Sequence, residues 1–498
     1  MQLRQLSGAP KFGLQRAASH VASASMISKL FGGGASSPTK QHKQHKQLWF
    51  NDASPSWDEL TNMVKSKQAA LGLDFWQDPE HAPTNPTALK RTFGQNGPIR
   101  VKLYRDHAAW CPYCQKVWLQ LEEKRIPYTM EKVNMRCYGD KQRSFLAKVP
   151  NGLLPVIELD GQVVTESSVI MQLLEEAFPD HTPLMPPRGT PSRMRAEQLM
   201  RLERRLFGDW LGWLTSDWSH DSNKARFVAV MDAVEKELQA AGGPFFLGAK
   251  LSLVDITFVP MLERIAASIA YYKGLYVRGS GRWPAVERWF NALELRPTLL
   301  GTKSDYYTHC HDLPPQLGGC AMTAEGVPVS QLIDGTAPGA WQLPLPPLSA
   351  SSLPEPYSPG ENPAADTLEA AAAMVKNHAA LVRFALRGPG QPGPRPVSAP
   401  LADPTAIPAE EWTAAGDAAL RHVAHALIVG VQAKQVSQQA LQVTATQPAG
   451  AAAQLQAGPV VQAAEYLRDR VGVPRDMKFP AARQLRAHLN WLIGTLTP

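Results

Sequence analysis

Hydrophobic and polar positions between residues 99 and 180 follow a pattern that changes period several times. Apolar residues at every second position predict a strand, and apolar residues three or four positions apart predict a helix. Strands are predicted at 100–104, 128–133, 155–159 and 162–165, and helices at 114–124, 138–148 and 167–177. Asp160 and Gly161, between the last two strands, favour the tight turn of a β-hairpin. The predicted order of elements is therefore β-α-β-α-β-β-α.

This order is that of the thioredoxin fold, and the pattern changes after it. The pattern is entirely helical from Pro191 to about Pro297, and Ser252 and Asp255 form a capping-box pattern ahead of an apolar run. Residues 311–363 are dense in proline, which favours a linker. Residues 364–498 are rich in alanine and carry apolar residues at helical spacing.

The chain of 498 residues is too long for one hydrophobic core, so several domains are expected. We predict a multidomain α+β protein with a thioredoxin-like domain at 99–180 and an all-α domain at 190–310. An extra Ala-rich helical domain is expected at 364–498, after the linker. Residues 47–98 form an N-terminal approach segment with one short helical pattern, at 57–70.

The net charge of the chain is located in its first 46 residues. The formal net charge is +7, and residues 1–46 carry seven Lys and Arg and no acid, so the remainder is formally neutral. A neutral remainder argues against nucleic acid as a partner. Ser, Ala and Gly without acids are typical of a transit peptide, which we expect to be disordered; the alternative is a tail with a chance charge bias. The predicted location is the chloroplast, with the mitochondrion as the alternative. No apolar run approaches the roughly 20 residues that cross a bilayer, so no membrane insertion is expected.

The motif with chemical meaning is Trp110-Cys111-Pro112-Tyr113-Cys114, between a predicted strand and a predicted helix. The first turn of a helix presents unpaired N–H groups and the positive end of the dipole, so a thiol there loses its proton more easily. Pro112 costs no hydrogen bond at the first helical position. Cys111 is therefore the candidate nucleophile. Cys114, one turn further along, can attack a mixed disulfide formed on Cys111.

A Cys-x-x-Cys pair can also be half of a zinc site. A second pair at zinc spacing is absent from the sequence, and the nearest candidates are His309, Cys310, His311 and Cys320. Isolated thiols and histidines are the default for such residues, so no metal is expected. Cys137 is assigned a structural or incidental role. Five cysteines are too few for a disulfide-stapled secreted domain, which favours a reducing compartment.

Two further pairs of residues point to a peptide ligand. Leu154-Pro155 precedes a predicted strand, where the thioredoxin fold holds a cis-proline beside the active cysteine. A cis X–Pro bond frees the preceding backbone N–H and C=O to pair with an extended peptide such as glutathione. Glu166-Ser167 opens the next predicted helix, where the helix N-terminus and a hydroxyl can bind a carboxylate and the Glu side chain an ammonium. The γ-glutamyl end of glutathione offers both groups; a simple N-cap is the alternative.

The sequence resembles the glutathione transferase superfamily over about residues 99–300. The resemblance rests on WCPYC, NGLLPVIELDG, TESS, LSLVDITFVP and RWPAVERWFNALELRPTL. It implies that residues 190–310 are the all-α transferase C-terminal domain. The reactive cysteine is similar to that of the omega, lambda, dehydroascorbate-reductase and glutaredoxin-like branches, and CPYC is the glutaredoxin form. The segment YLRDRVGVPRDMKFPAARQLRAHLNWLI resembles the iota class of cyanobacteria, algae and non-vascular plants, which supports a plastid location.

The resemblance implies roles for residues of the thioredoxin-like domain. Cys111 forms a mixed disulfide with glutathione, which is the expected co-substrate. Leu154 pairs through its backbone with the cysteinyl unit, and Pro155 is the cis-proline. Glu166 and Ser167 hold the γ-glutamyl group.

Further roles concern the rest of the ligand and the second substrate. Lys141 is the expected cation for the glycyl carboxylate, and Tyr113 belongs to the glutathione site. The second substrate is expected between the domains, near Tyr113, Trp210 and Trp213, with a core position as the alternative for the two tryptophans. Omega and lambda members usually lack a counterpart of Cys114, so monothiol and dithiol mechanisms both stay open.

Three hypotheses for the function follow. The first is a glutathione-dependent enzyme that deglutathionylates proteins or small adducts, acts as a thioltransferase or reduces dehydroascorbate. Its substrates would be glutathione and a small disulfide, glutathionylated or electrophilic compound, with weak conjugation because the cysteine bonds covalently to glutathione. The second is a non-catalytic ligand-binding or redox-sensing scaffold, and the third is iron–sulfur binding by Cys111 plus glutathione across a dimer. A homodimer and a protein partner for the C-terminal helices are further expectations.

Overall fold

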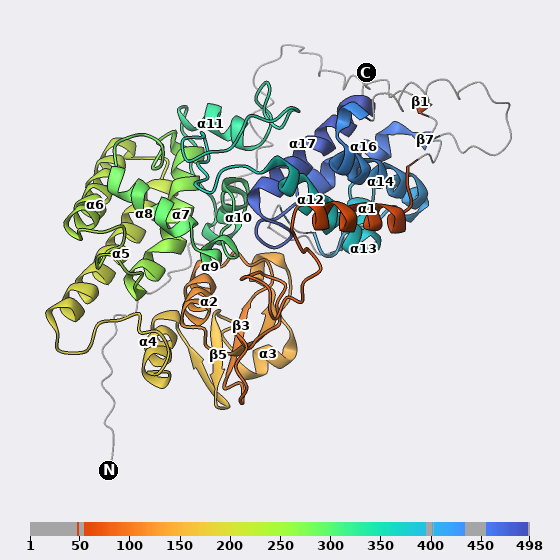
Figure 1. Cartoon of the computed structure of the whole chain (residues 1–498). Helices are drawn as coiled ribbons and strands as arrows, with labels where there is room; N and C mark the ends of the chain where they lie inside the picture. Colours follow the sequence, from red (N-terminus) through yellow and green to blue (C-terminus); the bar gives the residue numbers. More distant parts are fainter. Residues whose placement is uncertain (1–46, 49–53, 395–400, 402, 434–454, 497–498) are drawn as a thin grey trace, which may run out of the picture. The chain divides into compact units, whose positions relative to one another are not determined.

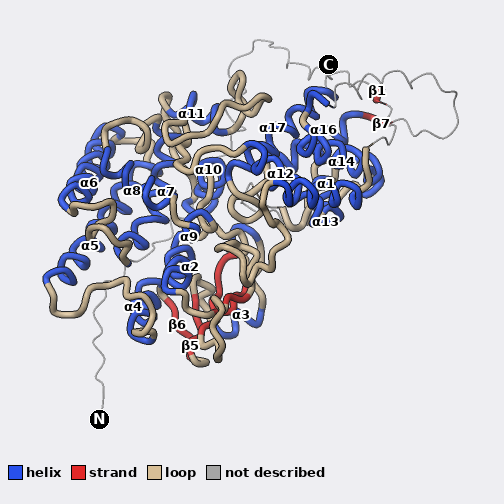
Figure 2. Tube along the Cα trace, viewed as in Figure 1, coloured by secondary structure: helices blue, strands red, loops and turns tan. Residues whose placement is uncertain are grey.

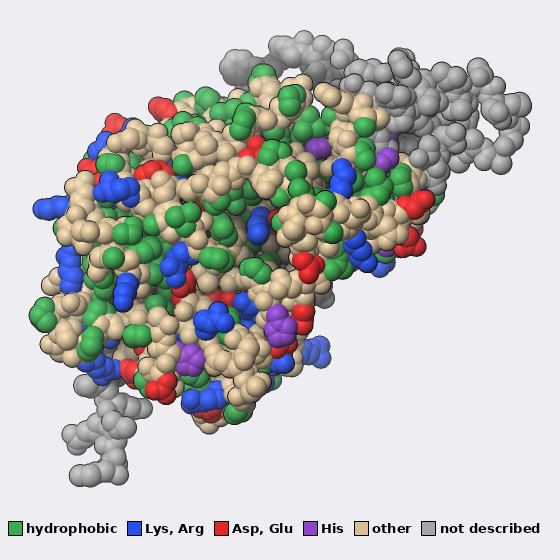
Figure 3. All heavy atoms as spheres, viewed as in Figure 1, with side chains coloured by type: hydrophobic (Ala, Val, Ile, Leu, Met, Phe, Trp, Pro, Cys, Tyr) green, Lys and Arg blue, Asp and Glu red, His purple; other side chains and the backbone are tan. Residues whose placement is uncertain are grey.

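The computed structural model describes residues 47–48, 54–394, 401, 403–433 and 455–496, which belong to one compact unit of the chain. The predicted transit peptide at 1–46 lies outside the described residues. Figure 3 shows Lys and Arg side chains interspersed with Asp and Glu over the face drawn, rather than gathered by sign. No helix in the described part of the chain is both long and apolar enough to span a bilayer.

The thioredoxin-like part is a five-stranded sheet in the order β2-β4-β3-β5-β6, in which β3 and β4 are parallel and the other neighbours antiparallel. Its strands are β2 (Lys90–Arg91), β3 (Val101–Asp106), β4 (Tyr128–Val133), β5 (Val156–Leu159) and β6 (Gln162–Thr165). Its helices are α2 (Pro112–Lys124), α3 (Arg143–Lys148) and α4 (Ser167–Ala177). The predicted order β-α-β-α-β-β-α and the fold class are confirmed, with β2 as an added edge strand.

Alternating side chains of β3 supply the two faces of this sheet. Val101 and Leu103 belong to the large core that also contains residues of α2 and α4, whereas Tyr104 packs with Phe145 of α3. Figure 1 shows α2 and α4 on one side of the strands and α3 on the other. The helix expected at 138–148 is divided into a 3₁₀ turn, η1 (Arg136–Tyr138), and α3, with Gly139 between them at φ 129°. An L side chain rarely adopts that φ, which explains the break.

The all-α part packs around one buried helix. Its helices are α5 (Pro191–Leu214), α6 (His220–Ala240), α7 (Leu253–Lys273), α8 (Pro284–Glu294) and α9 (Pro297–Leu300). Almost every residue of α7 is buried, and α7 packs directly on α2 of the thioredoxin-like part. The predicted capping box is present, because the Ser252 amide donates to Asp255 at 2.9 Å. The start of α7 is therefore fixed by contacts within its own first turn.

Residues 311–363 differ from the extended linker that their prolines predict. The segment begins inside α10 (Tyr306–Leu317) and contains α11 (Gly326–Ile333), which packs on α7. A Cβ at Gly326 would lie 2.6 Å from the carbonyl carbon and oxygen of Tyr272, so the absence of a side chain permits this contact. Proline density was a poor guide here because compact loops and helix starts tolerate proline as well as linkers do.

The C-terminal helices form a second hydrophobic core together with a helix from the start of the chain. They are α12 (Pro363–Lys376), α13 (His378–Ala385), α14 (Thr413–Val429), α16 (Ala457–Arg468) and α17 (Phe479–Leu496), with η2 (Glu410–Trp412) ahead of α14. The predicted helix at 57–70 is α1 (Trp57–Ala70), and it packs on α12 and α14. Trp57 donates from Nε1 to Asp417 at 2.7 Å. Figure 2 shows the strands confined to the thioredoxin-like part, apart from the short pair β1 (Gln47–Leu48) and β7 (Leu455–Gln456).

The loop between α16 and α17 joins this helical bundle to α10. The amide of Val473 donates to Thr308 Oγ1 at 3.2 Å, and the Tyr307 hydroxyl donates to the carbonyl of Asp469 at 3.0 Å. Both acceptor–donor pairs lie away from bulk solvent, because Thr308, Tyr307 and Val473 are buried. The extension is thus packed against the all-α part through specific contacts.

Candidate functional site

The strands β3, β5 and β6 bring the residues predicted to bind glutathione to one end of the sheet. β3 runs toward Asp106 and the loop that leads to Cys111, and Tyr104 pairs with Val156 at the start of β5. Val156 in turn pairs with Thr165 at the end of β6. Pro155 and Glu166, one residue beyond these pairs, therefore lie beside each other at the same end of the sheet as the Cys111 loop. The Leu154–Pro155 bond is cis, as expected.

Cys111 is the N-cap residue of α2, with Pro112 as the first helical residue. Its neighbours include the Cys114 thiol, whose sulfur lies within 4.8 Å, and the backbone N–H groups of Cys114 and Tyr113 in the first turn of α2. These donors lower the pKa of Cys111, the thiol of Cys114 most strongly, although burial and the charge of Asp106 oppose them. Cys111 is partly exposed. It is thus a thiol with enhanced thiolate character that solvent can reach.

Cys114 has the opposite character. Its residue is only 1% exposed, and burial raises the pKa of its thiol well above the usual value. The hydrogen bond and negative charge of Cys111 act in the same direction. Cys114 therefore keeps its proton and donates it toward Cys111, so the two sulfurs of the motif are electrostatically distinct.

Two buried charged residues that the sequence analysis did not single out flank the motif. Asp106 is 1% exposed and accepts the backbone N–H of Trp110 at 2.6 Å through Oδ2. Arg264, from α7, is also 1% exposed; it donates to the carbonyls of Trp110 and Pro260 and to Gln115 Oε1. The sequence offered one signal for each residue: Asp106 is an acid at the end of a predicted strand, and Arg264 belongs to a Glu-Arg pair inside the apolar run of α7. These residues fix the backbone immediately before Cys111.

Trp110 connects the motif to α10. Its indole Nε1 donates to His309 Nδ1 at 3.0 Å, and His309 is buried with a pKa well below its usual value because of desolvation. His311 instead pairs with Asp334 at 2.9 Å. Among the described residues, the one three-residue group with metal-ligating atoms in mutual reach is Asp106, Cys111 and Cys114. The residues around Cys310 thus form no such group in that part of the chain.

The other predicted glutathione-site residues have mixed environments. Tyr113 is 39% exposed beside Cys111, and partial burial together with the negative charge of Cys111 raises its pKa. Lys141 is half-buried and donates to the carbonyl of Asn134; burial lowers its pKa, while negative charge on the two cysteines would raise it. Glu166 is exposed at the N-cap of α4 with φ 67°, and Ser167 is the first residue of that helix.

Trp210 and Trp213 lie in the core of the all-α part rather than in a substrate pocket. Trp210 is 2% exposed and donates to Ser268 Oγ at 2.9 Å; Trp213 is fully buried and donates to His220 Nδ1 at 3.2 Å. Their helical spacing on α5 placed both on the inward stripe of that helix. Both tryptophans are therefore core residues, as the alternative interpretation predicted, and do not line a substrate pocket.

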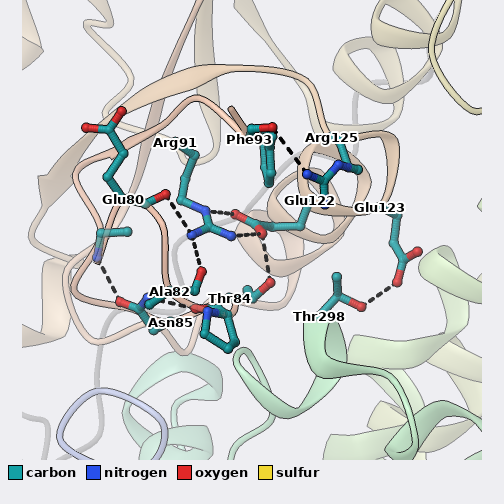
Figure 4. Close-up of polar contacts among 12 residues, drawn as sticks. Glu80, Ala82, Thr84, Asn85, Arg91, Phe93, Glu122, Glu123, Arg125 and Thr298 are labelled. Atoms are coloured by element: carbon teal, nitrogen blue, oxygen red, sulfur yellow. Dashed lines mark hydrogen bonds and ion pairs between the residues drawn. The ribbon is translucent and has the colours of Figure 1, made fainter. Parts of the chain in front are cut away.

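The far end of α2 is anchored by a buried ion pair to the approach segment, as Figure 4 shows. Arg91 contacts both carboxylate oxygens of Glu122, at 3.0 and 2.9 Å, and Thr84 donates to the same carboxylate at 2.7 Å. The remaining guanidinium nitrogen of Arg91 donates to carbonyls of residues 79–82. The edge strand β2 and the loop before it thus hold the far end of the helix whose first residues carry the motif.

Comparison with known proteins places this arrangement in context. Residues 110–177 match the family model "Glutathione S-transferase, N-terminal domain", and residues 217–292 match "Glutathione S-transferase, C-terminal domain". The chain is 32% identical over 194 residues to Glutathione S-transferase DHAR2 of Arabidopsis thaliana, covering 39% of this chain and 84% of that protein. It is 30% identical over 195 residues to Glutathione S-transferase DHAR3, chloroplastic, of the same plant, covering 39% and 69%. Glutathione transferase Omega 3C from Trametes versicolor is 32% identical, with 42% and 91% coverage and a TM-score of 0.37.

Proposed function

Because the chain belongs to the glutathione transferase family, we propose that it is a glutathione-dependent thiol transferase whose nucleophile is Cys111. Glutathione is its co-substrate. The observation that carries the choice of nucleophile is the position of Cys111, which is the partly exposed N-cap residue of α2 and has the Cys114 sulfur within 4.8 Å of its own sulfur. The positive end of the helix dipole and the neighbouring Cys114 thiol favour a thiolate there, which is the reactive form in exchange with disulfides.

The proposed reaction begins with attack by the Cys111 thiolate on the glutathione sulfur of a mixed disulfide R–S–SG. The S–S bond of the substrate breaks, Cys111–S–SG forms, and R–S⁻ leaves and takes a proton from solvent. A second glutathione thiolate then attacks the glutathione sulfur of the adduct. This step gives oxidised glutathione and restores the Cys111 thiolate. The R group can be a protein or a small molecule, and reduction of dehydroascorbate is a further candidate activity.

Binding of glutathione is proposed at the end of the sheet where Pro155 and Glu166 lie beside each other. The backbone of Leu154 would pair with the cysteinyl unit of the tripeptide. Glu166 and Ser167 would hold the ammonium and carboxylate of the γ-glutamyl unit, since an exposed carboxylate and a helix N-terminus are present there. Lys141 would face the glycyl carboxylate; its half-buried ammonium is electrostatically coupled to both cysteines.

A dithiol branch is favoured less than the monothiol route. Cys114 can resolve the adduct only as a thiolate, and burial raises the pKa of its thiol well above the usual value. In the proposed cycle Cys114 therefore acts as a hydrogen-bond donor to Cys111, and a second glutathione performs the release. The two routes differ in whether Cys114→Ser keeps its turnover.

Intact-mass spectrometry tests the proposal directly. Reduced protein, Cys111→Ser and Cys114→Ser would be treated with oxidised glutathione, and turnover would be followed with glutathione and a small mixed disulfide. We expect the wild type and Cys114→Ser to gain one glutathione and to turn over, and Cys111→Ser to do neither. A wild type that gains no glutathione and shows no turnover would favour the scaffold hypothesis. Turnover lost in Cys114→Ser, with the adduct retained, would establish the dithiol route.

We further propose a chloroplast location and membership of the iota class. The acid-free, Ser- and Ala-rich leader supports the location, as does the name of one relative, Glutathione S-transferase DHAR3, chloroplastic. The class assignment is supported by the segment from Tyr466 onward, which supplies the end of α16 and most of α17. A fluorescent protein fused after residue 46 tests the location. Accumulation in the cytosol would contradict it.

A further inference from the structure

Asp106, Cys111 and Cys114 bring three ligating atoms together at one end of the sheet. One carboxylate oxygen and the two sulfurs all lie within 4.8 Å of one another. The arrangement follows from the fold, because Asp106 ends β3 while Cys111 and Cys114 are one helical turn apart at the start of α2. Thiol transfer requires the two sulfurs at most, and the contact with the Trp110 amide accounts for only one of the two carboxylate oxygens of Asp106.

The carboxylate of Asp106 is oriented but only half satisfied. Oδ2 accepts the Trp110 amide at 2.6 Å, whereas Oδ1 is buried and has no hydrogen-bond partner among the described residues. Leaving a buried acceptor unpaired costs free energy, about 1–3 kcal/mol for a neutral group and more for a charged one. A backbone donor that fixes one oxygen and leaves the other free is also how supporting hydrogen bonds orient metal ligands.

The distances and donor types suit a tetrahedral thiophilic ion. Zn²⁺ binds sulfur at about 2.3 Å and carboxylate oxygen at about 2.0–2.2 Å, so neighbouring ligand atoms in a tetrahedron lie roughly 3.5–3.8 Å apart. Ligand atoms within 4.8 Å of one another need to approach by at most about 1.0–1.3 Å to reach this spacing. Two sulfurs and one oxygen exclude a preference for Ca²⁺ or Mg²⁺, which take oxygen ligands. The fourth position is left for water or an incoming thiolate.

The net charge of the three ligands and the exposure of Cys111 to solvent also suit a bound divalent cation. Two thiolates and a carboxylate carry three negative charges, and a divalent cation leaves one. Two buried arginines stand beside the group: Arg105 donates to the Asp106 carbonyl at 2.6 Å, and Arg264 donates to the Trp110 carbonyl. They can offset the residual charge of the occupied site. Cys111 is partly exposed next to exposed Tyr113, which provides a route from solvent.

We propose that Asp106, Cys111 and Cys114 form a reversible binding site for a thiophilic divalent cation such as Zn²⁺, which blocks Cys111 while it is bound. Binding displaces the proton of Cys114 and creates the second thiolate. The ion occupies the sulfur that attacks disulfides, so adduct formation with oxidised glutathione stops until a chelator removes the metal. The inference concerns binding and does not depend on turnover.

The test is a Zn²⁺ titration of reduced full-length protein against a chromophoric chelator. Wild type is compared with Asp106→Asn, Cys114→Ser and the control Asp160→Asn, an exposed carboxylate in the β5–β6 turn. We expect one Zn²⁺ per chain for the wild type and the control, and affinity lower by about 10–100-fold or more for the two site variants. Equal affinity for wild type and Asp106→Asn would overturn the role of Asp106, and absence of micromolar binding by the wild type would overturn the site.

A second measurement on the wild type keeps the proposal open to disproof if Asp106→Asn does not fold. Co²⁺ replaces Zn²⁺ and reports its ligands by absorption. We expect the charge-transfer intensity of two thiolates together with the strong visible bands of tetrahedral Co²⁺. Intensity for a single thiolate, or the weak bands of an octahedral ion, would contradict the three-ligand site. Loss of the signal on adding a chelator, with return of glutathione adduct formation at Cys111, is the expected sign of reversibility.

Discussion

Arg486 of α17 donates to Asp305 at 2.6 Å, and the side chains of both residues are almost completely buried. Asp305 is the N-cap of α10, where its other oxygen accepts the Thr308 amide at 2.9 Å. The guanidinium of Arg486 also donates to the carbonyl of Val471 at 2.9 Å. One ion pair thus links the C-terminal bundle, the loop between α16 and α17, and the helix that holds His309 beside Trp110.

Arg486→Met is expected to destabilise the protein strongly. Removing one partner leaves the Asp305 carboxylate buried without its cation, which typically costs about 3–5 kcal/mol. The free energy of unfolding, measured by urea denaturation, gives the result. Arg383→Met is the matched control, because Arg383 and Glu410 form a pair at 3.5 Å with both side chains 69% exposed, and such pairs contribute about 0–1 kcal/mol. Equal losses for the two variants would mean that the buried pair does not tie the bundle to α10.

A second buried ion pair, between Arg91 and Glu122, supports the C-terminal end of α2, opposite the end that carries Cys111. Arg91→Met removes the two contacts with Glu122 and the three carbonyl contacts that hold residues 79–82. We expect a loss on the order of 3–5 kcal/mol in the free energy of unfolding. Arg100→Met, which breaks an exposed pair with Asp160, should cost at most about 1 kcal/mol. Thermal unfolding of the two variants side by side distinguishes them; a loss below that of Arg100→Met would refute the anchoring role.

The local features of this fold could be read from the sequence, and the reason is physical. Strand and helix periods follow from backbone geometry alone, so the order from β3 to α4 was predictable. The capping box at Ser252 and the glycine-containing turn after Asp160 depend on residues at most three positions apart. For the same reason Cys111 could be assigned to a helix start before any coordinates.

Features that depend on distant contacts could not be read in this way. The helix at Trp57 was predicted, yet nothing in its pattern states that it packs on α12, more than 300 residues later in the sequence. The helical spacing of Trp210 and Trp213 on α5 is the same whether that side of the helix faces a pocket or a core. Arg264 gains its role only when α7 packs on α2, because only then can it reach the carbonyl of Trp110.

Burial of Glu355 predicts a pH dependence of stability. Desolvation raises the pKa of Glu355 to about 8, with the nearby Asp305 adding to the rise and Lys303 and Arg486 opposing it. The unfolded chain loses this proton near pH 4.5, whereas the folded chain holds it until about pH 8. The folded state binds more protons between these values, so the free energy of unfolding should fall as pH rises through this window, on the order of a few kcal/mol.

Glu355→Gln removes this titration while keeping the shape of the side chain. We therefore expect the variant to gain stability relative to wild type as pH rises from about 4.5 to 8. Chemical denaturation at several pH values measures the difference, which cancels the contributions of other buried carboxyls such as Glu263. Glu197→Gln, an exposed carboxylate on α5, serves as the control. A difference between Glu355→Gln and wild type that stays constant across the window would contradict the prediction.

The reactivity of Cys111 should respond in opposite directions to its two neighbours. The Cys114 thiol lowers the pKa of Cys111 by donating to its sulfur, and the Asp106 carboxylate raises it. Cys114→Ala removes the donor, so the pH at which Cys111 reaches half its maximal alkylation rate should rise. In Cys114→Ser, which keeps an O–H donor, this pH should rise less. Asp106→Asn removes the negative charge and should lower that pH. Iodoacetamide labelling of Cys111, followed by mass spectrometry over a pH series, measures all three. Shifts of the same sign for Cys114→Ala and Asp106→Asn would show that the thiolate is controlled by something other than these two groups.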